Sequence, residues 1–241
     1  MPRRITLAPA RTRLWLVALL FAIAGVGWWW TIGAIRGMDE GSWTGLGTLG
    51  WFLGVWVVMM AAMMLPSAWP TVTLYSRMLE KRSALSPLLF VAGYLATWAV
   101  VGLAAFTLAK AGGNVAGGAL AWDRAGRWLA AATLLAAAAY EFSPLKDACL
   151  GRCRSPFGFL VGAWQDGPAG AVRMGAKHGA WCVGCCWTLM ATLFALGVMS
   201  VTWMAFVAAL IAFEKLIRWR RVATSGTAAV LVVLAVTLLV A

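Results

Sequence analysis

The sequence predicts an all-α fold, a polytopic transmembrane helical bundle of about seven helices that forms one domain over residues 1–241. Hydrophobic residues make up 63% of the chain and charged residues only 12%, whereas about half of a soluble domain is apolar. Apolar runs of about 18 or more residues recur, and each is long enough to cross the hydrocarbon core of a bilayer. The basic residues, which give a net charge of +12, lie between these runs, which favours contact with anionic lipid over nucleic acid.

The first four helices are expected at about 14–35, 51–66, 87–108 and 127–141. We interpret the first run as a helix and not as a signal peptide, because it is long enough to span and no small-residue cleavage site follows it. Pro66 and Pro70 are expected to kink or break the second helix. The Ala-rich fourth helix allows close packing against its neighbours.

A long polar connection is expected at 142–177, followed by helices at about 179–198, 202–217 and 222–241. Orientation follows from the basic residues: with the N-terminus inside, all but four of the 20 Lys and Arg lie on the inner side. The four exceptions are Arg36, Lys110, Arg124 and Arg127. This asymmetry predicts a multi-pass protein of the bacterial inner (cytoplasmic) membrane, with a cytoplasmic N-terminus, an outer C-terminus and a cytoplasmic connection at 142–177.

The segment 178–187, with the sequence His-Gly-Ala-Trp-Cys-Val-Gly-Cys-Cys-Trp, holds the only His of the chain and three of its 5 Cys. On a helix, His178, Cys182 and Cys186 would share one face, with Cys185 beside them. Thiolates favour Cu(I), and zinc is the alternative because thiolate and imidazole together also suit it. Packing of buried cysteines is the competing explanation. A disulfide is less favoured, because Cys182 and Cys186 lie on one helix and the expected compartment is reducing.

Four methionines, Met59, Met60, Met63 and Met64, precede Pro66 in the second helix. Thioethers also favour Cu(I), although Met fills gaps in any apolar core and packing explains the same pattern. In the expected topology the second helix ends at the cytoplasmic boundary and the helix at 179–198 begins there. The sequence therefore predicts that methionines and cysteines lie at one depth, with Cys182, Cys185 and Cys186 in the first two turns of their helix.

Cys149 and Cys153 form a second pair beside Lys146, Arg152 and Arg154. Nearby positive charge favours the thiolate form, so the pair is either a two-thiolate site or two unpaired thiols.

Two acidic residues lie at helix ends. Glu141 has no obvious local partner, so a role in binding a proton or a metal ion stays open. Glu214 is expected to form an interfacial ion pair with Lys215 or Arg218. No Ser-His-Asp arrangement, phosphate-binding glycine loop or pair of catalytic carboxylates is recognisable. No enzymatic activity is predicted.

Three segments together resemble a known family. They are Trp-Val-Val-Met-Met-Ala-Ala-Met-Met-Leu-Pro-Ser-Ala-Trp-Pro at 56–70, Ser-Pro-Leu-Lys-Asp-Ala-Cys-Leu-Gly-Arg-Cys-Arg-Ser-Pro at 143–156, and the cysteine segment extended to Met190, with Glu214 and Lys215 following. The chain is similar over about 51–217 to the bacterial predicted metal-binding integral membrane proteins. In some bacteria these are linked to loading copper into a polyphenol oxidase.

The resemblance implies a Cu(I) chaperone or metallation factor that delivers copper to a cuproenzyme or oxidase client. Residue by residue, it points to Met59, Met60, Met63, Met64, Cys149, Cys153, His178, Cys182, Cys185 and Cys186 as metal ligands. At Glu141 we would expect the family to favour Gln, which argues against a universal role for this acid. Two alternatives stay open: a structural or assembly subunit of a membrane oxidase complex, and a thiol-redox membrane protein.

Overall fold

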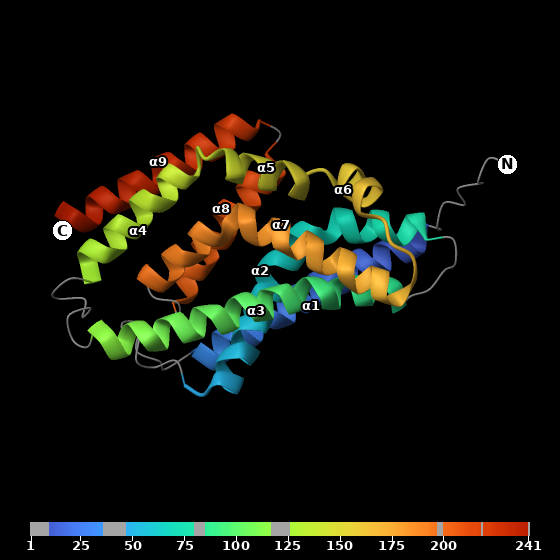
Figure 1. The fold of residues 1–241 in the computed structure, drawn as a ribbon, viewed down its shortest axis with the longest axis horizontal. Helices are drawn as coiled ribbons and strands as arrows, with labels where there is room; N and C mark the ends of the chain where they lie inside the picture. The colour runs from blue at the N-terminus through green and yellow to red at the C-terminus, as the bar shows by residue number, and fades with distance from the viewer. Residues whose placement is uncertain are drawn as a thin grey trace.

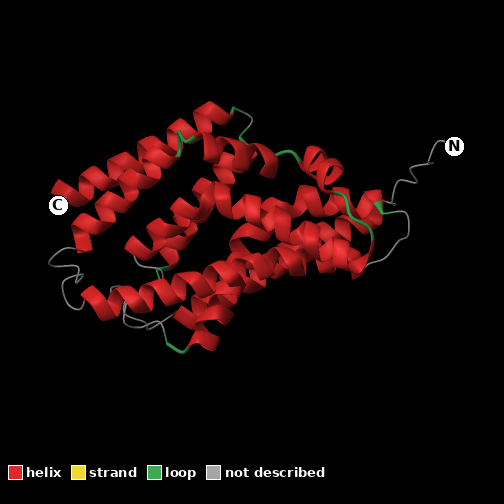
Figure 2. Ribbon diagram, viewed as in Figure 1, coloured by secondary structure: helices red, strands yellow, loops and turns green. Residues whose placement is uncertain are grey.

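The computed structural model describes residues 10–35, 47–79, 85–116, 126–196, 200–217 and 219–240. Within these ranges all secondary-structure elements are helices (Figure 2), which confirms the all-α prediction. The helices are α1 (Ala10–Ile35), α2 (Leu49–Met78), α3 (Leu85–Ala116), α4 (Arg127–Tyr140), α5 (Pro144–Cys153), α6 (Pro156–Ala163), α7 (Gly167–Leu196), α8 (Val201–Leu216) and α9 (Arg220–Val240). The expectations for Arg36, Arg124 and Arg218 lie outside the described residues.

Four of the helices, α1, α2, α3 and α9, are long and apolar enough to cross a membrane. A fifth span would be formed by α4 and α5 together, which are bent by 71° at their junction. The prediction of about seven spans is not confirmed. One physical reason is length, because α8 has 16 residues, which is about 24 Å of helix against roughly 30 Å of hydrocarbon.

The prolines of α2 do not break it. The helix continues from Leu49 to Met78 through both Pro66 and Pro70, so the break expected there does not occur. Side-chain hydroxyls near the prolines donate to carbonyls of the same helix: Ser67 Oγ lies 2.8 Å from the Met64 carbonyl and Thr73 Oγ1 lies 2.8 Å from that of Trp69.

The segment expected as a polar connection at 142–177 is largely helical, since it contains α5, α6 and the first part of α7. Its prolines mark helix starts. The hydroxyl of Ser143 caps α5 by accepting a bond from the Lys146 N–H at 3.1 Å, and Pro144 and Pro156 occupy the first turns of α5 and α6. Proline is favoured at that position because its missing N–H has no partner to lose.

The cysteine segment lies further along its helix than predicted. Because α7 begins at Gly167, Cys182 lies near the middle of a 30-residue helix and not in its first two turns. The position predicted for Cys182, Cys185 and Cys186, in the first two turns of their helix, is therefore wrong, while their depth in a membrane stays a prediction.

The long helices α3 and α7 run together through the middle of the molecule, and α4 and α9 lie side by side along one edge (Figure 1). Glycines bring α3 and α7 close. A Cβ atom at Gly93 would meet the Val172 carbonyl, and one at Gly175 would meet that of Phe90. Small residues of this kind let apolar helices approach each other, and here they bring Tyr94 of α3 against Cys182 of α7.

A candidate three-thiol metal centre

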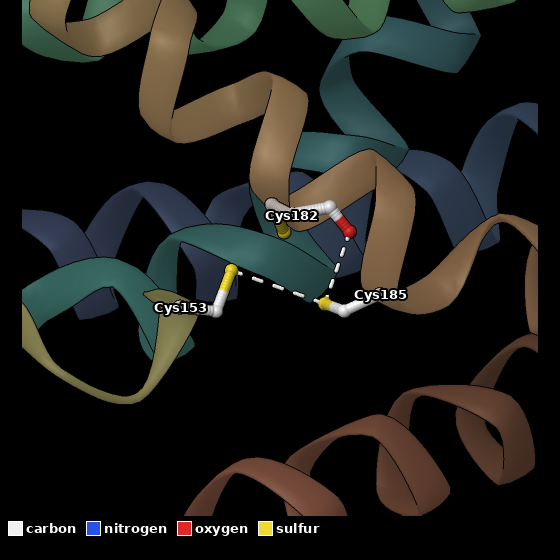
Figure 3. Close-up of side chains that lie close together, drawn as sticks. All are labelled: Cys153, Cys182 and Cys185. Carbon is white, nitrogen blue, oxygen red and sulfur yellow. Dashed lines mark hydrogen bonds between the residues drawn. The ribbon is translucent and has the colours of Figure 1, made fainter. Parts of the chain in front are cut away.

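Three cysteine sulfurs meet where the end of α5 packs on the middle of α7. Cys153 comes from α5 and Cys182 and Cys185 from α7, and their Sγ atoms all lie within 4.8 Å of one another (Figure 3). The Sγ atoms of Cys153 and Cys185 are 3.9 Å apart. The two cysteines of α7 are buried, whereas Cys153 is half-buried. All three are free thiols, and such a group suits a soft metal ion.

Close packing of α5 on α7 creates this meeting point. Gly184 leaves room for α5, because a Cβ atom there would lie 2.6 Å from Cys149 Sγ. The hydroxyl of Tyr140 donates to the carbonyl of the same glycine at 2.7 Å. Cys149 therefore packs in the helix interface, one turn before Cys153, and is not a member of the three-thiol group.

Cys182 lies beside a positive charge. Lys215 Nζ on α8 is 3.2 Å from Cys182 Sγ, and the Tyr94 hydroxyl is 3.0 Å from the same sulfur. Lys215 also donates to Ser67 Oγ of α2 at 2.9 Å. An ammonium group at this distance favours the thiolate over the thiol, and the thiolate is the form that binds metal.

The other residues predicted from the 178–187 segment are buried next to the group but do not belong to it. The Cys186 thiol donates to the Cys182 carbonyl at 2.9 Å. His178 packs among the rings of Phe90, Tyr94 and Phe159, with centroid distances of 5.9, 5.9 and 4.9 Å. Its buried Nδ1 has no hydrogen-bond partner among the described residues. Whether His178 and Cys186 bind metal stays a prediction.

The four methionines of α2 are buried in the same hydrophobic core as Cys182, Cys185 and Cys186. One of them reaches the edge of the site, because Met64 Sδ lies 3.9 Å from Lys215 Nζ. Met64 and Cys182 thus share Lys215 as a neighbour, while the predicted common depth of methionines and cysteines stays a prediction. Metal binding by Met59, Met60, Met63 and Met64 stays a prediction.

The two acidic residues at helix ends have an unexpected common partner. Lys146 Nζ lies 2.5 Å from Glu141 Oε1 and 2.8 Å from Glu214 Oε2, and all three side chains are buried. Glu214 thus pairs with Lys146 and not with Lys215, and Glu141 does have a partner. Consecutive residues of a helix do not face each other, so Lys215 points to α7 while Glu214 points to α5. With 142–177 expected as a loop, the burial of Lys146 was not foreseeable.

Fold and site together define a class: an all-helical protein with several candidate membrane spans and a group of three cysteines able to hold a soft metal ion. A family model described as PpoB2, copper chaperone, matches residues 53–238. The chain belongs to this copper chaperone family, which confirms the resemblance to a copper-handling family. No curated protein and no solved structure matches the chain. The matched region contains all three cysteines of the group.

Proposed function

We propose that this protein is an integral membrane Cu(I) chaperone of the bacterial inner membrane that holds its cargo on Cys153, Cys182 and Cys185. The observation that carries the proposal is the convergence of three thiols from two helices, all within 4.8 Å. Membership of a copper chaperone family supports it, and the apolar helices support a membrane location. The role is binding and transfer of a metal ion, not catalysis.

The ligand set favours Cu(I) over zinc. Soft thiolates and thioethers select Cu(I), whereas structural zinc is almost always held by four Cys or His ligands. The group offers three thiols, and the thioether of Met64 near its edge suits Cu(I) better than zinc. Zinc remains the alternative to be tested.

The exposure of the thiols suggests a direction of loading. Cys153 is half-buried at the end of α5, while Cys182 and Cys185 are buried, so Cys153 is the first thiol that incoming copper would meet. Cys149, Cys186, His178 and the α2 methionines are the surrounding soft side chains, and Met64, whose Sδ lies 3.9 Å from Lys215 Nζ, would receive copper next. The recipient is a cuproenzyme or oxidase client.

Metal content of the purified full-length protein tests this function. Wild type and the Cys182→Ser/Cys185→Ser variant are purified in detergent under reducing conditions and analysed for both copper and zinc. Cys149→Ser and Cys186→Ser serve as matched controls, because each removes a buried cysteine outside the three-thiol group. We expect stoichiometric copper in wild type and both controls, and little in the double variant. Equal copper in wild type and the double variant, or zinc in place of copper, would overturn the proposal.

A further inference from the structure

The helix that carries Cys153 is anchored by a buried group of three ionisable side chains. Lys146, in the first turns of α5, pairs with Glu141 at the end of α4 and with Glu214 at the end of α8. One carboxylate oxygen of each acid, Glu141 Oε2 and Glu214 Oε1, is buried without a hydrogen-bond partner among the described residues. Both acids therefore depend on Lys146, because a buried charge is costly unless it is paired.

Other polar contacts of α5 are weaker anchors. Asp147 pairs with Arg220 of α9, but these side chains are 65% and 41% exposed, and exposed ion pairs contribute little. Arg154, just after α5, donates to the Ile217 carbonyl. Removing one partner of a buried ion pair, in contrast, leaves uncompensated charges behind. The Lys146 contacts thus dominate the polar attachment of α5.

Spacing along α5 connects this anchor to the thiol group. Lys146, Cys149 and Cys153 follow one another at helical intervals of three and four residues, which places them on one face. Lys146 and Cys149 are buried, and Cys149 contacts α7 near Gly184. Fixing Lys146 between α4 and α8 therefore turns this face of α5 towards α7 and brings Cys153 to Cys185.

We propose that Lys146 is a positioning residue that holds the third thiol of the site in place. Without it, α7 still presents Cys182 and Cys185, because both lie on one helix, but Cys153 is no longer held against them. The copper readout of this proposal rests on the function proposed above. The positioning itself is a property of the metal-free protein and can be tested alone.

The metal-free test is disulfide formation between Cys153 and Cys185. In a full-length background of Cys149→Ser/Cys182→Ser/Cys186→Ser, only these two thiols remain, and their sulfurs are 3.9 Å apart in the structure. Oxidation with diamide is followed by mass spectrometry without reductant. We expect fast disulfide formation in this background and at least about a tenfold slower reaction after Lys146→Met, because displacing two reacting atoms slows the reaction between them. Asp147→Asn is the matched control and should leave the rate unchanged.

The copper test is a double-mutant cycle. Lys146→Met should weaken Cu(I) binding by about 10- to 100-fold, about as much as Cys153→Ser. The double variant should bind Cu(I) no more weakly than either single variant, because both changes remove the same ligand. Additive losses would overturn the proposal, as would an unchanged rate of disulfide formation. If wild type binds no copper, the proposed function fails, and the disulfide rates still decide the role of Lys146.

A second variant covers the case in which Lys146→Met does not fold. Glu141→Gln/Lys146→Met/Glu214→Gln removes all three charges together, so no buried charge is left unpaired, and such neutral replacements are often tolerated. We expect this variant to fold, as judged by circular dichroism and gel filtration, and to form the Cys153–Cys185 disulfide at least about tenfold more slowly than the starting background. A rate equal to that of the starting background would overturn the proposal.

Discussion

The side-chain nitrogen of Lys215 lies 3.2 Å from the sulfur of Cys182, while the preceding residue, Glu214, forms an ion pair with Lys146. Two consecutive residues at the end of α8 therefore contact the two helices that supply the three thiols. Lys215 faces α7, which carries Cys182 and Cys185, and Glu214 faces α5, which carries Cys153. The end of α8 is thus part of the support of the site as well as its source of positive charge.

The charge on Lys215 should strengthen Cu(I) binding. Three thiolates and one Cu(I) leave a net negative charge inside the protein, and an ammonium group next to Cys182 offsets part of it. We expect Lys215→Met to lower Cu(I) affinity by about 10- to 100-fold, measured by competition with a chromophoric Cu(I) chelator. Lys177→Met is the control, because Lys177 is an exposed lysine on α7. Equal affinities for wild type and Lys215→Met would show that this charge does not act on the bound metal.

Copper binding should weaken as the pH falls. Cysteine binds metal as the thiolate, so protons compete with Cu(I) for each sulfur and binding is favoured at higher pH. Between about pH 8 and pH 6, the affinity should drop by up to about tenfold per pH unit for each thiol that must lose a proton. The Cys153→Ser variant has one thiol fewer and should show a shallower dependence. Identical slopes for the two proteins would argue that Cys153 is not a ligand.

Much of the fold followed from the sequence, because apolar runs of membrane length are a strong signal for helices. The approximate positions of α1, α2, α3, α4, α8 and α9 were predicted on this basis. The short helices α5 and α6, which begin at Ser143-Pro144 and Ser155-Pro156, lie in the segment that was expected as a polar connection. The same serine and proline residues are typical of helix starts, and the apolar pattern of these short helices was too brief to decide between a helix and a loop.

The sequence predicted the types of residue in the site better than their arrangement in space. All three cysteines of the group were candidates, but Cys153 was considered with Cys149, either as a two-thiolate site or as two unpaired thiols, because sequence spacing cannot show that α5 folds back on α7. Lys215 was expected to pair with Glu214 for a similar reason: the nearest opposite charge in the sequence was considered first. Partners from distant segments, such as Lys146 for Glu214, depend on tertiary packing and leave no local signal.

The role of His178 can be separated from that of the thiols. His178 lies among three aromatic rings, its Nδ1 is unpaired among the described residues, and it is outside the three-thiol group. Phe is of similar shape and removes the buried polar atom, whose desolvation is unfavourable. We expect His178→Phe to keep the copper content of wild type and to melt at the same or a higher temperature. A loss of copper would make His178 a ligand, as the sequence predicted.

Close contact between α3 and α7 should matter for both stability and copper binding. A Cβ atom at Gly175 would collide with the Phe90 carbonyl, and a collision with backbone cannot be relieved by turning a side chain. Gly175→Ala should therefore push the helices apart and destabilise the fold by about 1–3 kcal/mol, as overpacking does, measured by unfolding in detergent. Gly162→Ala in α6 is the control, since a Cβ atom there meets nothing within 4 Å and alanine is the better helix former.

The same substitution should also reach the metal site, because Tyr94 of α3 contacts Cys182 of α7 at 3.0 Å four residues after the colliding Phe90. Separating the helices withdraws this hydroxyl from the sulfur, so Gly175→Ala should lower Cu(I) affinity, whereas Gly162→Ala should not.

The Tyr94→Phe variant removes the hydroxyl and leaves the helix contact intact. If the lost hydroxyl accounts for the effect, Gly175→Ala and Tyr94→Phe should weaken copper binding by similar factors, but only Gly175→Ala should lower the stability markedly. A Gly175→Ala protein that is destabilised yet binds copper like wild type would show that the α3–α7 contact supports the fold without shaping the thiol group.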